Sequence, residues 1–252
     1  MHSLIRGVFG LVYETPAGRA LQPHVLSLEE ITQLLSTIQN RTISRRRRAR
    51  GGLKPLTMPR YHIKIRDHLM VSLIYRYGLT QDEPGRILVS DLDLERATIY
   101  IRRVEGTSRT YPLFPDLIPL AVDWKHRRPL PQHCGPAKCA VLLPPPEEDH
   151  LFPHTFSLKT ADGPRLQGIT AKSITRILVD TEQLAQLSRP KYYATPAALR
   201  RAIGAHLAAA NWHPDEVAFH LGLDSPYTPT IAEYRERLKS CVDRHLLASL
   251  AT

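Results

Sequence analysis

Apolar residues recur at helical spacing in several parts of the chain. The first such stretch opens with the sequence S-L-E-E at Ser27–Glu30, a capping box that predicts the start of a helix. The residues of its apolar face are Ile31, Leu34, Leu35 and Ile38. The same spacing predicts a second helix over residues 65–77, which Gly78 is placed to end. Further helices are expected over residues 115–126, 170–187, 195–210, 214–221 and 230–250.

Three short segments between the second and third helices have the composition of strands. They cover residues 87–89, 98–102 and 109–113, and Glu105-Gly106 is placed to form a hairpin turn between the last two. The proline-rich residues 129–165 are expected to form an irregular insertion. Helices, then a short sheet, then helices again predict an α+β fold, mainly α-helical, with a small antiparallel three-stranded sheet. We divide the chain into an N-terminal arm, residues 1–26, and one domain, residues 27–250.

The chain is strongly basic. It has 252 residues, with 34 Lys and Arg against 24 Asp and Glu, a formal net charge of +10. Arginine dominates the cations, and its guanidinium group grips phosphate oxygens bidentately. The longest apolar stretch, Leu69–Tyr75, is too short to span a membrane, and nothing resembles a signal peptide. Three cysteines are too few for a disulfide framework, so we expect a cytoplasmic, nucleoid-associated protein.

The positive charge is concentrated between Arg41 and Arg66. This segment holds ten cations and no acidic residue, and its centre, Ser44–Gly52, is expected to be a mobile loop. A solvated charge run and a localisation-like peptide are two interpretations, and an arm that contacts DNA phosphates is the one that we favour. The residues expected to bind DNA in this basic loop, residues 41–66, are Arg45, Arg46, Arg47, Arg48, Arg50 and Lys54.

No metal site or cofactor site is expected. Cys134 and Cys139 lie near His133, but the C-x4-C spacing lacks the second Cys/His pair that a zinc site needs.

Five segments, in order, resemble the tyrosine recombinases, also called the phage integrase family. From Thr195 the sequence T-P-A-A-L-R-R-A-I-G-A-H-L is similar to the family's T-P-H-x-L-R-H-T-F-A-T-H-L, and the spacing from Arg200 to Leu221-Gly222 matches without a gap. Y-G-L-T-Q-D-E, beginning at Tyr77, resembles the family's T-G-L-R-x-x-E. Residues 88–101 and 107–113 resemble strands of the family's small sheet, and Tyr234 stands in the place of its nucleophile.

The resemblance implies a reaction in which a tyrosine attacks a DNA phosphate and forms a phosphotyrosyl link. In the family, two arginines and a His or Trp hold the phosphate, a lysine on the sheet protonates the leaving oxygen, and a further His assists. Of these positions this chain keeps only Arg200 and Tyr234 as catalytic candidates. Arg200 and its neighbour Arg201 are also expected to bind DNA. The positions of the first arginine, the lysine and the two His or Trp residues are occupied by Thr80, Val104, Ala197 and Leu223.

Neighbouring residues offer replacements for the missing cations, and the retained residues have structural interpretations. Strand alternation disfavours Arg103 as a substitute at Val104, because adjacent residues point to opposite faces. Tyr234 also fits a core position of the last helix, with Tyr227 as a second candidate nucleophile, and Arg200 also fits a structural ion pair. The other candidate replacements are Arg86, Arg102, Arg201 and His206.

The leading hypothesis is a DNA-binding protein with the tyrosine-recombinase fold, catalytically degenerate, that acts in recombination or integration of a mobile element. One alternative is an active recombinase with a rearranged site, and another is a protein-interaction module that kept the fold. The implied partners are double-stranded DNA and, on it, a partner recombinase or further copies of this chain. No membrane partner is expected.

Overall fold

A computed structural model describes residues 13–14, 20–21, 25–41, 60–127, 149–153, 158–160, 163–165, 168–187 and 194–241. The helices of this part are α2 (Leu28–Asn40), α3 (Arg60–Tyr77), α4 (Leu117–Arg127), α5 (Ala171–Ala185), α6 (Pro196–Ala209), α7 (Pro214–His220) and α8 (Ile231–Cys241). The strands are β1 (Tyr13–Glu14), β2 (Ala20–Leu21), β3 (Leu92–Asp93), β4 (Thr98–Ile101), β5 (Arg109–Pro112), β6 (Leu158–Thr160) and β7 (Gly163–Arg165).

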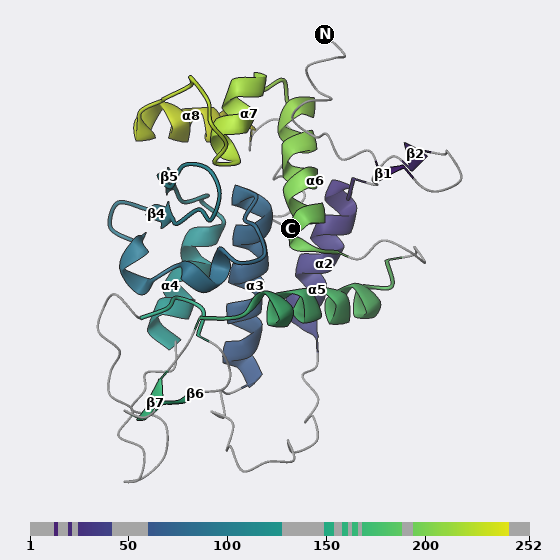
Figure 1. The fold of residues 1–252 in the computed structure, drawn as a ribbon, viewed down its shortest axis with the longest axis vertical. Helices are drawn as coiled ribbons and strands as arrows, with labels where there is room; N and C mark the ends of the chain where they lie inside the picture. The colour runs from purple at the N-terminus through teal and green to yellow at the C-terminus, as the bar shows by residue number, and fades with distance from the viewer. Residues whose placement is uncertain are drawn as a thin grey trace.

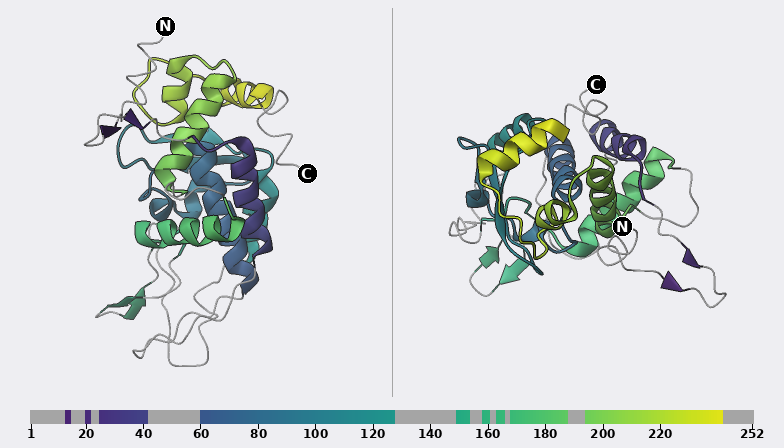
Figure 2. Two further views of the ribbon diagram at one scale, coloured as in Figure 1. Left: turned by 90° about the vertical axis from the view of Figure 1, so that its right-hand side faces the viewer. Right: turned by 90° about the horizontal axis from the view of Figure 1, so that it is seen from above.

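Helix α3 forms the centre of the fold. It packs against α2, α4 and α6, and α5 crosses beside α2 (Figure 1). Almost every side chain from Ile65 to Tyr77 is buried, as expected of a helix with neighbours on all sides. Helices α7 and α8 lie together at one end of the domain, next to the C-terminal end of α3 (Figure 2). This end holds the candidate site.

The capping box predicted for the first helix is confirmed. The Ser27 hydroxyl accepts a hydrogen bond from the backbone N–H of Glu30, and the Glu30 carboxylate accepts one from the N–H of Ser27 at 2.8 Å. The four apolar residues predicted for its inner face are all buried. This local signal is sufficient because a capping box satisfies two otherwise unpaired N–H groups within four residues.

The small sheet has the predicted antiparallel arrangement, in the order β3-β4-β5. Ile99 on the central strand pairs with Leu92 on one side and Tyr111 on the other, and all three side chains are buried. The prediction of a strand over residues 87–89 is wrong: this segment lies between the 3-10 helices η1 (Pro84–Arg86) and η2 (Val89–Asp91), with one isolated bridge at Leu88. The first strand is β3 instead.

The helix predicted over residues 65–77 begins earlier, at Arg60, so the end of the predicted basic loop is helical. The prediction placed the start at the first strongly apolar turn, whereas the polar turn before it continues the same helix. A two-stranded hairpin, β6–β7, also lies within the segment expected to be irregular. The division into an arm and one domain stays a prediction.

Candidate DNA-phosphate site

Arg200 lies one turn into α6. Thr195 caps this helix, and its hydroxyl accepts a hydrogen bond from the N–H of Ala198 at 3.1 Å. The half-buried Arg200 side chain donates a hydrogen bond to the carbonyl oxygen of Gly78, just after α3. Within the described residues, no carboxylate forms an ion pair with Arg200. The guanidinium group therefore keeps a net positive charge at the junction of α3 and α6.

Gly78 makes this junction narrow enough for the two helices to touch. Its backbone adopts φ of 57°, a left-handed conformation that favours glycine at the end of a helix. A Cβ atom at this position would lie 3.3 Å from Cγ of Arg200 and collide with the Leu221 side chain. Gly78 thus brings the end of α3 against both α6 and the turn after α7.

Arg103, in the connection between β4 and β5, is the second cation at this junction. Its side chain is fully buried and forms an ion pair with Glu83 at 3.0 Å. It also donates to the carbonyl oxygens of Tyr77 at 2.8 Å, Gly78 at 3.3 Å and His220 at 3.2 Å. Arg103 and Val104 alternate as neighbouring strand residues do, since Arg103 is buried and Val104 is exposed. The buried side chain of Arg103 is the one that lies near Arg200, because both donate to the carbonyl oxygen of Gly78.

The charge of Arg103 acts on Arg200. Burial lowers the pKa of Arg200, and the nearby positive charge of Arg103 lowers that pKa further. The negative charge of Glu83 opposes this effect. The exposed carboxylate of Glu105 acts in the same direction as Glu83, but more weakly. Glu83 is therefore the one buried carboxylate that acts on the two arginines of this junction.

The four positions at which the resemblance places further catalytic groups hold no charged or imidazole side chain, and their surroundings differ. Val104 is 42% exposed and Ala197 is exposed, so neither side chain contributes to a pocket. Leu223 is half-buried against the core. The N–H of Thr80 donates to Glu83 at 2.8 Å, and within the described residues its buried hydroxyl has no hydrogen-bond partner.

Two of the four other candidate replacements are engaged elsewhere. Arg102 forms a bidentate pair with Asp91, at 2.8 and 2.7 Å, and His206 bonds the hydroxyl of Tyr75 at 2.8 Å. Arg86 is exposed. Arg201 is half-buried, and its Nε has no hydrogen-bond partner in the described part of the chain.

Tyr234 points into the core from α8. It is 2% exposed, and its ring meets those of Tyr111, Trp212 and Phe219 edge-on. Its hydroxyl bonds Nδ1 of His220, whose Nε2 lies 2.6 Å from the carbonyl oxygen of Arg76. A carbonyl oxygen only accepts, so Nε2 carries the proton and Nδ1 accepts from Tyr234.

Burial fixes the protonation of this Tyr–His pair. It lowers the pKa of His220 to about 3, with the charges of Arg103 and Arg200 acting in the same direction. It raises the pKa of Tyr234 well above the usual value. At neutral pH both groups are uncharged, and the phenol donates its hydrogen bond to a neutral imidazole.

The second tyrosine candidate lies outside this junction. Tyr227 is half-buried, packs edge-on against Phe219, and has charged neighbours in Glu216, Arg237 and Glu233. Desolvation raises the pKa of its hydroxyl as well. Arg200 is not among the charges that act on it.

The two ends of the basic run are not free for phosphate. Arg41 and Arg66 both form ion pairs with buried Asp67, the acidic residue that follows the run directly. Arg41 also donates to Thr181 at 3.4 Å, and Arg66 to the carbonyl oxygen of Pro153 at 3.4 Å. These two arginines hold α2, α3 and α5 together. The predicted DNA-binding residues Arg45, Arg46, Arg47, Arg48, Arg50 and Lys54 lie outside the described residues.

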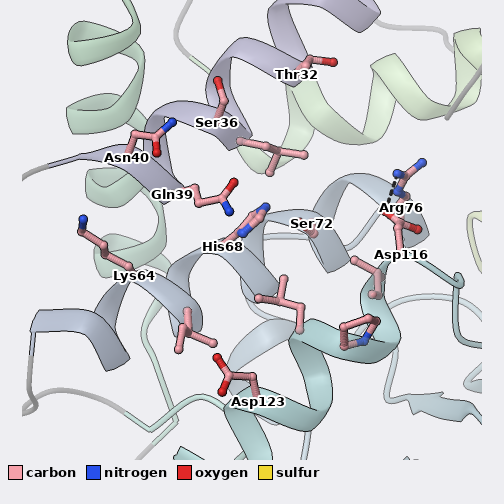
Figure 3. Close-up of a pocket in the computed structure, with 15 residues that line it drawn as sticks. Thr32, Ser36, Gln39, Asn40, Lys64, His68, Ser72, Arg76, Asp116 and Asp123 are labelled. Carbon is pink, nitrogen blue, oxygen red and sulfur yellow. Dashed lines mark hydrogen bonds and ion pairs between the residues drawn. The ribbon is translucent and has the colours of Figure 1, made fainter. Parts of the chain in front are cut away.

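A groove of about 730 Å³ lies on another side of α3, between α2 and α4 (Figure 3). Lys64 and Asp123 line one end, and the ion pair of Arg76 with Asp116 lines the other. Neither Arg200 nor Tyr234 borders it. Its lining mixes both signs of charge with neutral side chains, so it does not resemble a phosphate site.

Among the described residues, no helix is both long and apolar enough to cross a membrane. The same part of the chain holds no group of three or more His, Cys, Asp or Glu arranged to bind a metal. Cys134, Cys139 and His133 lie outside it.

Comparison with solved structures gives several tyrosine recombinases. XerA recombinase matches with a TM-score of 0.54 and 15% identity over 97% of this chain and 73% of its own. An integrase from mycobacterium phage Brujita matches with a TM-score of 0.52 and 17% identity, over 93% and 65% of the two chains. XerH site-specific recombinase bound to difH substrate gives 0.54 and 17%, over 95% and 62%. At such identities the likeness shows the fold, and this chain spans about two thirds of these proteins.

No curated protein matches the chain in sequence. The sequence model described as "Phage integrase family" matches residues 25–237, which include α2 to α7 and most of α8. The small antiparallel sheet of a mainly helical domain agrees with this match. The chain therefore belongs to the phage integrase family, the tyrosine recombinases.

Proposed function

We propose that this protein binds duplex DNA through its recombinase fold, in recombination or integration of a mobile element, and does not itself cut or join strands. One observation carries the proposal: Arg200 has a charge that no carboxylate in the described residues neutralises, at the family's phosphate position. Isolated charges of this kind are costly to bury, which favours a role that uses them. The XerH complex with difH substrate supports DNA as the partner.

The absence of strand cleavage is supported by the surroundings of Tyr234. Each missing oxyanion contact costs about 10²–10³ in rate, and general acid catalysis contributes about 10²–10⁴. Thr80, Val104, Ala197 and Leu223 supply neither kind of group. The alternative is an active recombinase in which Arg86, Arg102 or Arg201 replaces the missing cations, but Arg102 is paired with Asp91. The guanidinium of Arg103 is fully buried and bonded to five protein acceptors.

DNA binding is tested by titration with salt. Log affinity for a short fluorescent duplex should fall linearly with log salt between about 50 and 200 mM, because bound cations displace counterions from phosphate. Neutralising Arg45–Arg48 with glutamine should flatten the slope. Affinity that does not respond to salt, or no binding at the lowest salt, would instead support the protein-interaction module.

Arg200→Ala is expected to weaken DNA binding about tenfold, the loss typical of a charge-assisted contact, and to lower the salt slope by about one. The melting temperature should change little, since Arg200 has no ion pair to lose in the described residues. Arg176→Ala, which removes an exposed arginine from α5, is the matched control and should leave affinity nearly unchanged. A large fall in melting temperature with intact affinity would instead favour a structural role for Arg200.

No covalent protein–DNA adduct is expected on suicide substrates built from sequences that the protein selects out of a random duplex pool. The phenol of Tyr234 is buried, protonated and bonded to His220. Denaturing electrophoresis detects an adduct directly, and Tyr234→Phe should leave DNA affinity unchanged. An adduct that disappears in this variant would establish an active recombinase instead.

A further inference from the structure

Glu83 is a buried carboxylate that both arginines of the junction influence. It accepts hydrogen bonds from the N–H of Thr80 at 2.8 Å, the N–H of Val104 at 3.3 Å and the guanidinium of Arg103 at 3.0 Å. It is 0% exposed, so no water replaces these partners. Among these three partners, Arg103 supplies the only positive charge.

Arg200 is the competing cation. It donates to the carbonyl oxygen of Gly78, which also accepts a hydrogen bond from Arg103 at 3.3 Å. The two guanidinium groups thus converge on one acceptor, and the charge of Glu83 reaches Arg200 as well. Glu105 is exposed and acts on Arg200 more weakly, so Glu83 is the one buried carboxylate for two arginines. The observed ion pair of Glu83 is with Arg103.

The backbone is shaped to admit Arg103. A Cβ atom on Gly222, which adopts φ of 73°, would collide with the Arg103 guanidinium, and a Cβ atom on Gly106 would collide with the carbonyl oxygen of Gly222. The N–H of Thr107 donates to that same oxygen at 2.9 Å. The connection between β4 and β5 is therefore docked on the turn after α7, and it delivers Arg103 to Glu83.

We propose that Arg103 is a positioning residue: by pairing with Glu83 it keeps this carboxylate from neutralising Arg200, whose charge stays free for a DNA phosphate. Residue 80 is a threonine and supplies no cation for this task. The inference rests on the proposed function, since it concerns how Arg200 binds phosphate. Without Arg103, Glu83 turns to Arg200, and the site loses its net positive charge although Arg200 is still present.

A double substitution separates this role from a structural one. Arg103→Met should weaken DNA binding about as much as Arg200→Ala, about tenfold, and should likewise lower the salt slope by about one. Adding Glu83→Gln removes the carboxylate that captures Arg200, so the double variant should regain most of the lost affinity. It should regain this affinity even where its melting temperature stays below that of the unchanged protein.

The outcomes are distinct. If the double variant binds as weakly as Arg103→Met, Arg103 is merely structural and the inference is overturned. If Arg103→Met does not fold, Glu83→Gln alone decides: affinity at or above that of the unchanged protein supports the inference, and a tenfold loss refutes it. If Arg200→Ala has no effect on affinity, the proposed phosphate role of Arg200 fails first, and the inference with it. If Arg200→Ala weakens binding and Arg103→Met does not, only the inference fails.

Discussion

Replacing Arg103 with methionine is expected to lower the free energy of unfolding by about 3–5 kcal/mol. The substitution leaves Glu83 buried without its cation, which is the costly way to break a buried ion pair. It also removes the donors that the carbonyl oxygens of Tyr77, Gly78 and His220 now share. For a chain of this size, such a loss corresponds to a fall in melting temperature of roughly 10 °C.

Urea unfolding followed by circular dichroism measures this loss, and the adjacent arginine provides the control. Arg102 pairs with Asp91 but is 44% exposed at its side chain, so Arg102→Met should cost about 1 kcal/mol or less. Adding Glu83→Gln to Arg103→Met should recover part of the loss, because no uncompensated charge then remains buried. Equal costs for the two arginine substitutions would contradict the structural weight that we assign to Arg103.

The sequence was sufficient for elements whose signals are local. The capping box at Ser27, the apolar faces of the helices and the hairpin turn near Gly106 depend on residues a few positions apart. The prediction of a strand over residues 87–89 is wrong because a short apolar run does not distinguish a strand from irregular backbone. Ile87 and Leu88 are buried between two 3-10 helices, and Val89 begins the second of them. Only Leu88 forms a bridge, and its partner, His150, lies far away in the chain.

The candidate site was predictable only in part. Motif spacing predicts Arg200 and Tyr234 as candidates, and their roles stay predictions. Arg103 and Glu83 meet through a turn that docks on α7, a contact between residues 20 positions apart that no local period encodes. In the sequence, Glu83 is marked only by its place at the end of the Y-G-L-T-Q-D-E segment. Its role in the junction follows from its ion pair with Arg103, which the structure shows.

Counting the cations of the basic run overestimates how many of them are free to bind phosphate. Ten cations without an acid between Arg41 and Arg66 suggest a continuous phosphate-binding arm. Asp67, the very next residue, pairs with the two at its ends. These arginines fix where the run enters and leaves the folded domain, so any contact with phosphate falls to the cations between them.

The second large expected effect comes from His220: the free energy of unfolding should fall in mild acid. In the unfolded chain its pKa is about 6.5, and in the folded protein burial lowers the pKa to about 3. Between these values the unfolded state binds one proton more than the folded state, so stability falls as pH falls. The contribution is fully present above about pH 7, and about 2 kcal/mol of it is lost on going down to pH 5.

Two partly buried histidines act in the same direction. Desolvation also lowers the pKa of His68 and of His206. The contribution of His220 is therefore measured by comparing a variant with the unchanged protein, and not from the pH dependence of the unchanged protein alone. His220→Gln should be less stable than the unchanged protein at pH 7.5, because the pair of bonds to Tyr234 and to the carbonyl oxygen of Arg76 is disturbed.

The decisive measurement is the free energy of unfolding of His220→Gln between pH 7 and pH 5. It should fall about 2 kcal/mol less over this range than that of the unchanged protein. His126→Gln, at an exposed position near the end of α4, is the control, and its fall in stability is compared with that of His220→Gln. If His220→Gln loses as much stability as His126→Gln over this range, His220 takes up its proton in the folded state without penalty. In that case His220 is protonated between pH 5 and pH 7 and does not accept a hydrogen bond from Tyr234. The neutral Tyr–His pair, on which the proposed absence of strand cleavage partly rests, would then be wrong.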